Sequence, residues 1–155
     1  MARTVHSWYL RNAYVENNLV EPGKLRLKGE SLNLGQVKLG INAFGAERDH
    51  IVPWDAAWRI CQLMSGTVRY VLASSGHIAG MINPPGGKGA YWTNEAEVDT
   101  PARWRESAQR HDGSWWVDWA AWLAEHSGAK RAPPSLGSNA YPPVRDAPGG
   151  YVLQK

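Results

Sequence analysis

The sequence predicts an α/β fold in which parallel strands are flanked by helices. Residues 37–44 form an apolar stretch that ends at Gly45, and residues 68–73 form a second one. Between them, residues 54–64 carry large apolar side chains at the spacing i, i+4, i+7, which is typical of a helix with one apolar face. Two strands joined through a helix run parallel, because parallel pairing needs a crossover of about this length.

The remaining segments predict further helices around this unit. Residues 24–35, which contain Gly29, indicate a short hairpin or an extended loop. Thr100 and Pro101 have the residue types preferred at the N-cap and first position of a helix. The predicted helices cover residues 5–20, residues 101–110, and the segment between an N-cap at Ser114 and a final Gly128.

The chain divides by composition into a domain and a tail. Residues 1–130 have the apolar patterning of one globular domain. Residues 131–155 contain five prolines and little periodicity, so we expect an extended tail that packs on the domain surface or is partly disordered.

Composition excludes several classes of function. The net charge of +3 in 155 residues is mild and the basic residues are scattered, which argues against nucleic acid as a partner. A single cysteine, Cys61, excludes an internal disulfide and fits a reducing compartment. No apolar run approaches the roughly 18 residues of a membrane span. We therefore expect a cytoplasmic protein.

An acid and a histidine follow the two predicted strands. Asp49 comes after the first strand and His77, 28 positions later, after the second. Side chains at the carboxyl ends of neighbouring parallel strands gather at one edge of a sheet. Acid before histidine is also the order in which α/β-hydrolase-type enzymes present two members of a nucleophile–acid–histidine triad. The nucleophile should come earlier, in a G-x-S-x-G or G-x-C-x-G turn, and the sequence contains neither.

The chemistry of such a pair is well defined. A carboxylate bonded to one ring nitrogen holds a histidine in a single tautomer, so that the other nitrogen can accept a proton from an attacking thiol or hydroxyl. Taken singly, however, Asp49 also fits the N-cap of the following helix, and His77 fits an ordinary structural histidine. The order and placement of the two together favour the catalytic interpretation.

The other candidate residues are weaker. Cys61 shares the apolar stripe of its helix and lacks flanking glycines, so we interpret it as a core cysteine and not as the nucleophile. His50 either supports Asp49 or contacts a substrate, or it is a loop histidine, and the sequence does not separate these alternatives. The remaining histidines lie at scattered positions without metal-ligand spacing, so we expect no metal site.

The tryptophan-rich helix after Ser114 has two interpretations. Its five large apolar side chains share one face, which fits a helix that docks on the sheet. The same face would also suit a surface that touches an apolar ligand or polymer. The residues are Trp115, Trp116, Trp119, Trp122 and Leu123.

Several motifs together resemble the C-terminal part of polyhydroxyalkanoate synthases, most closely the class I type that works without a second synthase subunit. The resemblance covers nearly the whole chain. It rests on Trp8-Tyr9-Leu10-Arg11 with Glu16-Asn17-Asn18, residues 49–54, residues 75–80 with 82–85, residues 91–94, Gly113-Ser114-Trp115-Trp116 with Asp118-Trp119, and residues 147–152.

This resemblance implies an acyltransferase that polymerises (R)-3-hydroxyacyl-CoA into polyester and releases CoA, without a cofactor. It implies that His77 is the general base, that Asp49 is the acid, and that His50 matches a family histidine beside the acid. The family nucleophile is a cysteine upstream of every segment present here. We therefore expect the C-terminal part of an α/β-hydrolase fold, truncated before the nucleophile and inactive alone.

Other expectations follow from the missing part. Strands that lack their neighbours leave an open sheet edge and an uncovered apolar face, which predicts self-association or poor stability in isolation. A missing N-terminal half supplied in trans is a further candidate partner. The alternatives to a synthase segment are a non-catalytic module that binds polyester granules or a synthase subunit, and a fragment of an esterase or depolymerase with the same fold. A synthase segment would also be found at the granule surface.

Overall fold

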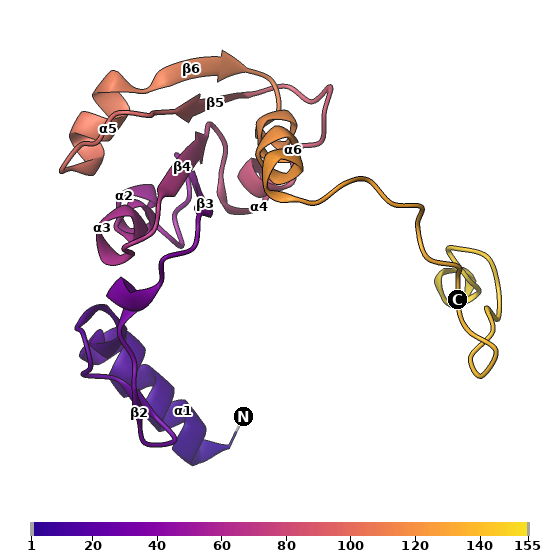
Figure 1. The fold of residues 1–155 in the computed structure, drawn as a ribbon, viewed down its shortest axis with the longest axis horizontal. Helices are drawn as coiled ribbons and strands as arrows, with labels where there is room; N and C mark the ends of the chain where they lie inside the picture. The colour runs from indigo at the N-terminus through magenta and orange to yellow at the C-terminus, as the bar shows by residue number, and fades with distance from the viewer. Residues whose placement is uncertain (1, 155) are drawn as a thin grey trace. The chain divides into compact units, whose positions relative to one another are not determined.

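The computed structural model describes residues 2–154, whose central feature is a four-stranded mixed sheet (Figure 1). Its strands, in spatial order, are β3 (Ile41–Ala46), β4 (Val68–Ala73), β5 (Ala90–Thr93) and β6 (Gln109–Asp112). β3 and β4 are parallel, while β4–β5 and β5–β6 are antiparallel. The predicted strand–helix–strand unit is confirmed, but the fold is mixed α/β because two antiparallel strands complete the sheet.

Five helices accompany the sheet. The predicted helix over residues 54–64 is present as α2 (Trp54–Trp58) and α3 (Ile60–Leu63), which meet at Arg59. The two predicted N-caps are formed, since Thr100 Oγ1 accepts from Arg103 N at 3.2 Å and Ser114 Oγ accepts from Trp116 N at 3.1 Å. The other helices are α4 (His77–Met81), α5 (Pro101–Ser107) and α6 (Trp115–His126).

Strand β4 is the centre of the core because both of its faces are covered. Alternate side chains point to opposite faces of a strand. Tyr70 and Leu72 join Trp58, Trp92 and Trp104 in one buried cluster. Val71 and Ala73 pack in a second cluster with the N-terminal turn of α6. Accordingly, Figure 1 shows α2 and α3 on one side of β3 and β4, and α4 and α6 on the other.

Close packing fixes α4 against the sheet. Gly80 in α4 lies so near β3 that a Cβ on it would stand 2.7 Å from the Ala46 Cβ. The indole Nε1 of the buried Trp115 donates to the Gly80 carbonyl at 2.9 Å, and Trp116 Nε1 donates to the Met81 carbonyl at 2.8 Å. These contacts confirm that the first turn of the tryptophan-rich helix docks on the domain.

The N-terminal helix is shorter and more exposed than predicted. It consists of α1 (Arg3–Tyr9), which continues as the π-helix η1 (Leu10–Val15), so it ends five residues before the predicted end at 20. Asn17 adopts a left-handed conformation with φ of 48°, and the chain leaves the helix there. No residue of α1 or η1 is buried, although apolar contacts were expected along this helix.

Of the two alternatives expected for residues 24–35, a short hairpin or an extended loop, the structure contains the hairpin. β1 (Arg26–Leu27) and β2 (Glu30–Ser31) pair antiparallel around Lys28 and Gly29, both at positive φ. Such a two-residue turn matches the twist of the strands, and Gly29 enters the left-handed region without steric cost. The short 3₁₀ segments η2 (Asn18–Val20) and η3 (Leu34–Gln36) flank the hairpin.

Two boundaries and one strand differ from the sequence prediction. β3 begins at Ile41 and not at 37, because the Val37 carbonyl accepts from Ser65 and Gly66 in a turn before the strand. The helix predicted to reach Arg110 ends at Ser107, and Arg110 lies in β6. Three of the four residues of β6 are exposed, so it lacks the alternation of apolar side chains that predicts a strand.

The chain separates by its internal contacts into two compact units, and the division falls between Glu125 and His126. In residues 127–154 the regular secondary structure consists of the 3₁₀ turn η4 (Tyr151–Leu153). Across residues 2–154, none of the helices is both long and apolar enough to cross a bilayer.

Candidate active site

Asp49 and His77 meet where β3 and β4 end. Asp49 lies in the loop that follows β3, and His77 begins α4 after the short loop that follows β4, where the prediction had placed it in the loop itself. His77 Nδ1 lies 2.8 Å from Asp49 Oδ2. The two strands are paired in register from Ile41–Val68 to Ala46–Ala73, so their loops leave the sheet at the same level.

The local structure holds the carboxylate in its charged form. Asp49 Oδ1 accepts from the backbone N–H groups of Ile51 and Val52 at 2.8 and 2.9 Å. The bond from Val52 is the largest cause that lowers the pKa of Asp49 from 3.8 to about 2, and the contact with His77 lowers it further. An ionised carboxylate only accepts hydrogen bonds, so His77 Nδ1 carries the proton of this contact. In the neutral imidazole Nε2 then holds the free lone pair.

The pair borders an apolar pocket of about 330 Å³. Asp49 is largely covered, with 9% of its side chain exposed, whereas 42% of the His77 side chain is exposed. The apolar lining comes from β3, the loop after it, α2, α4 and the residue that follows α4: Phe44, Val52, Ala57, Ile78, Met81 and Ile82. A proton acceptor beside an apolar hollow suits a substrate with an apolar body and a reactive polar group.

Cys61 and His50 lie outside this pocket. Cys61, on α3, is half-buried against the cluster that contains Trp58 and Tyr70, and burial raises the pKa of its thiol to about 11. The thiol is therefore protonated at neutral pH and does not behave as an activated nucleophile. The His50 side chain is exposed and does not line the pocket, although its neighbour Asp49 does.

Two charged residues that sequence reasoning missed fasten the Asp49 loop. Arg48 Nε donates to the Ser74 carbonyl at 2.9 Å, and Glu47 pairs with Arg105 of α5 at 2.9 Å. Their positions directly before Asp49 were visible in the sequence, but their partners lie 26 and 58 positions away and only the fold brings them near.

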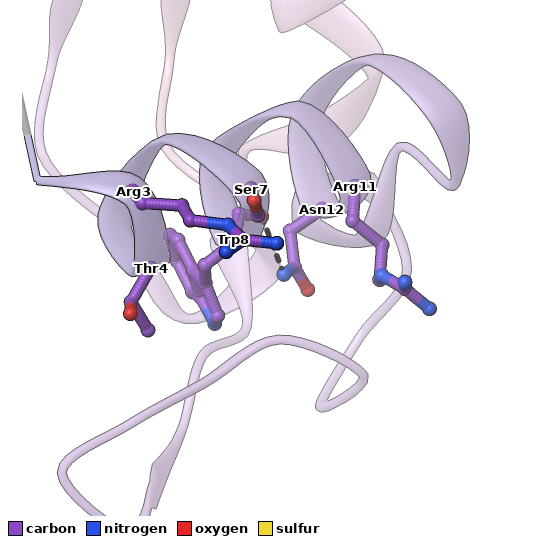
Figure 2. A pocket seen from close by; sticks show the side chains of 6 residues that line it. All are labelled: Arg3, Thr4, Ser7, Trp8, Arg11 and Asn12. Atoms are coloured by element: carbon purple, nitrogen blue, oxygen red, sulfur yellow. Dashed lines mark hydrogen bonds between the residues drawn. The ribbon is translucent and has the colours of Figure 1, made fainter.

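A second hollow lies on the N-terminal helix and carries none of the predicted site residues. It measures about 500 Å³, and Figure 2 shows its six lining side chains along one side of α1 and η1. Asn12 Nδ2 donates to the Trp8 carbonyl there, and Arg3 and Arg11 contribute guanidinium groups. It holds neither carboxylate nor imidazole, so it offers no general base.

The arrangement of Asp49 and His77 is suited to acid–base chemistry. Within residues 2–154, no hydroxyl or thiol is hydrogen-bonded to His77 Nε2, and no three His, Cys, Asp or Glu side chains converge as metal ligands would. A histidine held by a carboxylate is the base half of a nucleophilic site.

Replacement of Asp49 by Asn should flatten the acid dependence of stability. The pKa of Asp49 is lowered in the folded state, so its ionised form contributes stability above about pH 4, and this contribution is lost as the pH falls towards 2. We measure the free energy of unfolding in urea at several pH values between about 5 and 2. As the pH falls, the free energy of unfolding should decrease more steeply for the wild type than for Asp49→Asn. Parallel curves would contradict this account of Asp49.

Comparison with known proteins finds close relatives of one kind. No family model matches the sequence. The poly(3-hydroxyalkanoate) polymerase subunit PhaC of Cupriavidus necator is 46% identical over 152 residues, which cover 97% of this chain and 26% of that protein. Poly(3-hydroxyalkanoate) polymerase 2 of Ectopseudomonas oleovorans is 42% identical over 90% of the chain, and the PhaC subunit of Rhizobium etli is 35% identical over 100% of it.

The alignments cover 24% to 26% of these three curated relatives, in their C-terminal part. Asp49, His77 and the motifs around them lie within the aligned length, since the alignments span nearly the whole chain. The resemblance that the sequence motifs predicted is therefore confirmed: over nearly its whole length, this chain is similar to the C-terminal part, about a quarter, of curated poly(3-hydroxyalkanoate) polymerases.

Proposed function

We propose that this chain supplies the acid and the base of a polyhydroxyalkanoate polymerase, and that the nucleophile belongs to a segment outside this sequence. The hydrogen bond between His77 Nδ1 and Asp49 Oδ2, beside an apolar pocket, is the observation that carries the proposal. Identities of 35% to 46% with polymerases support the same reaction class. The fold would then be the C-terminal part of an α/β-hydrolase fold.

In the proposed reaction, a cysteine thiol attacks the thioester carbonyl of an (R)-3-hydroxyacyl-CoA. His77 Nε2 takes the thiol proton as the new carbon–sulfur bond forms, and it returns that proton to CoA as the old bond breaks. The 3-hydroxyl of another unit then attacks the enzyme-bound acyl group. His77 takes the hydroxyl proton as the ester bond forms and returns it to the cysteine sulfur as the enzyme thioester bond breaks. Each cycle adds one ester bond and releases one CoA.

Asp49 would act on this cycle through His77. Its carboxylate keeps the proton on Nδ1, so that Nε2 is the acceptor, and stabilises the imidazolium ion that forms when the proton arrives. Alternatively, Asp49 assists the incoming 3-hydroxyl directly. The apolar pocket would hold the hydrocarbon part of the acyl group, because burying its methylene groups is favourable by about 0.8 kcal/mol each.

A chimera tests the proposal directly. This chain replaces the final quarter of the Cupriavidus necator polymerase, and CoA release from 3-hydroxybutyryl-CoA is followed. We expect the chimera to be active, and His77→Ala to reduce the rate by about 10²-fold or more because the base is lost. His6→Gln, in an exposed histidine of α1, should leave the rate unchanged.

The isolated chain provides the second arm of this experiment. It should release no CoA, since a base without a nucleophile has no group to activate. The proposal fails if the isolated chain turns over and His77→Ala abolishes that turnover, or if a folded chimera keeps its activity when His77 is replaced.

We also propose that the chain self-associates through β3. This strand ends the sheet, and no other strand within residues 2–154 pairs with its outer edge. Ile41 N and Glu47 N donate to the β4 side, so the backbone groups of the alternate residues Asn42 and Phe44 face outward. The strand contains neither charge nor proline, the features that commonly protect an edge from pairing.

Sedimentation at several concentrations tests this association. The average molecular mass of the wild type should rise with protein concentration. Asn42→Pro removes an outward N–H and leaves the hydrogen bonds to β4 intact, so this variant should remain monomeric. Asn42→Ala is the matched control and should associate. A wild-type protein that is monomeric throughout, with amides of Asn42 and Phe44 that exchange equally fast at every concentration, would contradict the proposal.

A second candidate function is attachment to a polyester surface through α6. The indoles of Trp115 and Trp116 are hydrogen-bonded to carbonyls of α4. Further along the helix, Trp119 and Leu123 are 38% and 36% exposed. Exposed apolar side chains on one helix face are a feature of surfaces that bind apolar partners. This would place the protein at the granule surface.

Co-sedimentation with purified polyester granules tests the second candidate. The double variant Trp119→Ala/Leu123→Ala should remain in the supernatant to a greater extent than wild type, because it loses apolar contact area. Leu136→Ala, in an exposed leucine outside α6, is the control and should sediment like wild type. Equal sedimentation of all three proteins would count against α6 as the binding surface.

A further inference from the structure

We propose that Arg48 and Glu47 are positioning residues that hold the Asp49 loop against the His77 loop and thereby keep the Asp49–His77 hydrogen bond formed. The inference deepens the proposed function and rests on it for its catalytic meaning. Neither residue lines the pocket, so neither is expected to touch a substrate.

Arg48 bridges the two loops by its backbone and by its side chain. Its N–H donates to the Ser75 carbonyl at 3.1 Å, and its Nε donates to the Ser74 carbonyl at 2.9 Å. Ser74 and Ser75 lie between β4 and His77, while Arg48 directly precedes Asp49. The side-chain contact therefore spans the same gap as the hydrogen bond between Asp49 and His77.

The acceptor of Arg48 is itself fixed. Ser74 N donates to the Ala90 carbonyl at 2.9 Å, and Ser74 Oγ accepts from Ala90 N at 3.0 Å. This double contact fastens the start of the His77 loop to β5. The hydrogen bond from Arg48 to Ser74 therefore attaches the Asp49 loop to a residue that is itself hydrogen-bonded to β5.

Glu47 anchors the Asp49 loop from a second direction. Its carboxylate accepts from Arg105 of α5 at 2.9 Å, and both side chains are about one-third exposed. The Arg105 guanidinium lies 3.9 Å from the centre of the Trp92 ring, which belongs to the buried cluster of the sheet. Stacking on an aromatic ring restrains the guanidinium, so the ion pair has a defined position.

These restraints matter because the hydrogen bond is open to competition. His77 is 42% exposed, and water can replace Asp49 as the partner of Nδ1 whenever the loops move apart. A small displacement of a positioned group weakens catalysis strongly. Arg48 and Glu47 oppose that displacement through two separate contacts. Arg48 is bonded to Ser74, and Glu47 is paired with Arg105.

Exchange of the His77 Nδ1 proton with water, followed by ¹⁵N NMR on the full chain, measures this directly. Loss of one ordinary hydrogen bond corresponds to a factor of roughly two to ten in an equilibrium. We expect Arg48→Gln to accelerate the exchange by roughly that factor. Arg48→Lys, which keeps the positive charge, should accelerate it less than Arg48→Gln. Glu47→Ala should also accelerate the exchange. Arg103→Gln, in an exposed pair with Asp99, is the matched control and should not change it.

The amide of the fully buried Leu72 separates positioning from general stability. In the positioning account, exchange at His77 accelerates while exchange at Leu72 does not. Equal acceleration at both positions, or none at His77 in Arg48→Gln, would overturn the inference. Because the measurement uses no substrate, its result stands apart from that of the chimera: an inactive chimera with the expected exchange rates refutes the proposed function and leaves the positioning role intact.

Discussion

The parallel pairing of β3 and β4 is the constraint on which the rest of the site depends. Six residues of each strand are paired in register, so the loops after Ala46 and Ala73 emerge side by side. Asp49 and His77 are 28 positions apart in the chain and meet at 2.8 Å because of this pairing. A shift of β3 by one residue relative to β4 would turn the side chains of β3 to the opposite faces and would displace the two loops relative to each other.

Several contacts serve this one arrangement. The buried clusters on the two faces of β4 hold the strand in place, and the indoles of Trp115 and Trp116 hold α4, which begins with His77. The backbone amides of Ile51 and Val52 keep Asp49 charged, with its pKa lowered to about 2. The result is a carboxylate–histidine pair beside an apolar hollow, the geometry that the proposed role as the acid and base of a nucleophilic active site requires.

Much of this site could be predicted from the sequence, because its signals are local. Residues 68–73 are strongly apolar, the spacing of Trp54 and Trp58 is helical, and a strand–helix–strand order implies parallel pairing. The prediction failed where the signal was weak. β6 (Gln109–Asp112) is polar and mostly exposed, β5 is only four residues long, and the N-terminal helix has apolar side chains without a buried face. The partners of Glu47 and Arg48 depend on tertiary contacts, which no periodicity encodes.

The central claim is that His77 serves a nucleophile from outside this sequence. A crystal structure of the chimera with the upstream part of the Cupriavidus necator polymerase measures this most directly, through the distance from His77 Nε2 to the nucleophilic sulfur. The account predicts hydrogen-bond reach, about 2.6–3.2 Å or somewhat longer for sulfur, with Asp49 still bonded to Nδ1. A nucleophile that approaches another histidine, or a His77 turned away from Asp49, would contradict it.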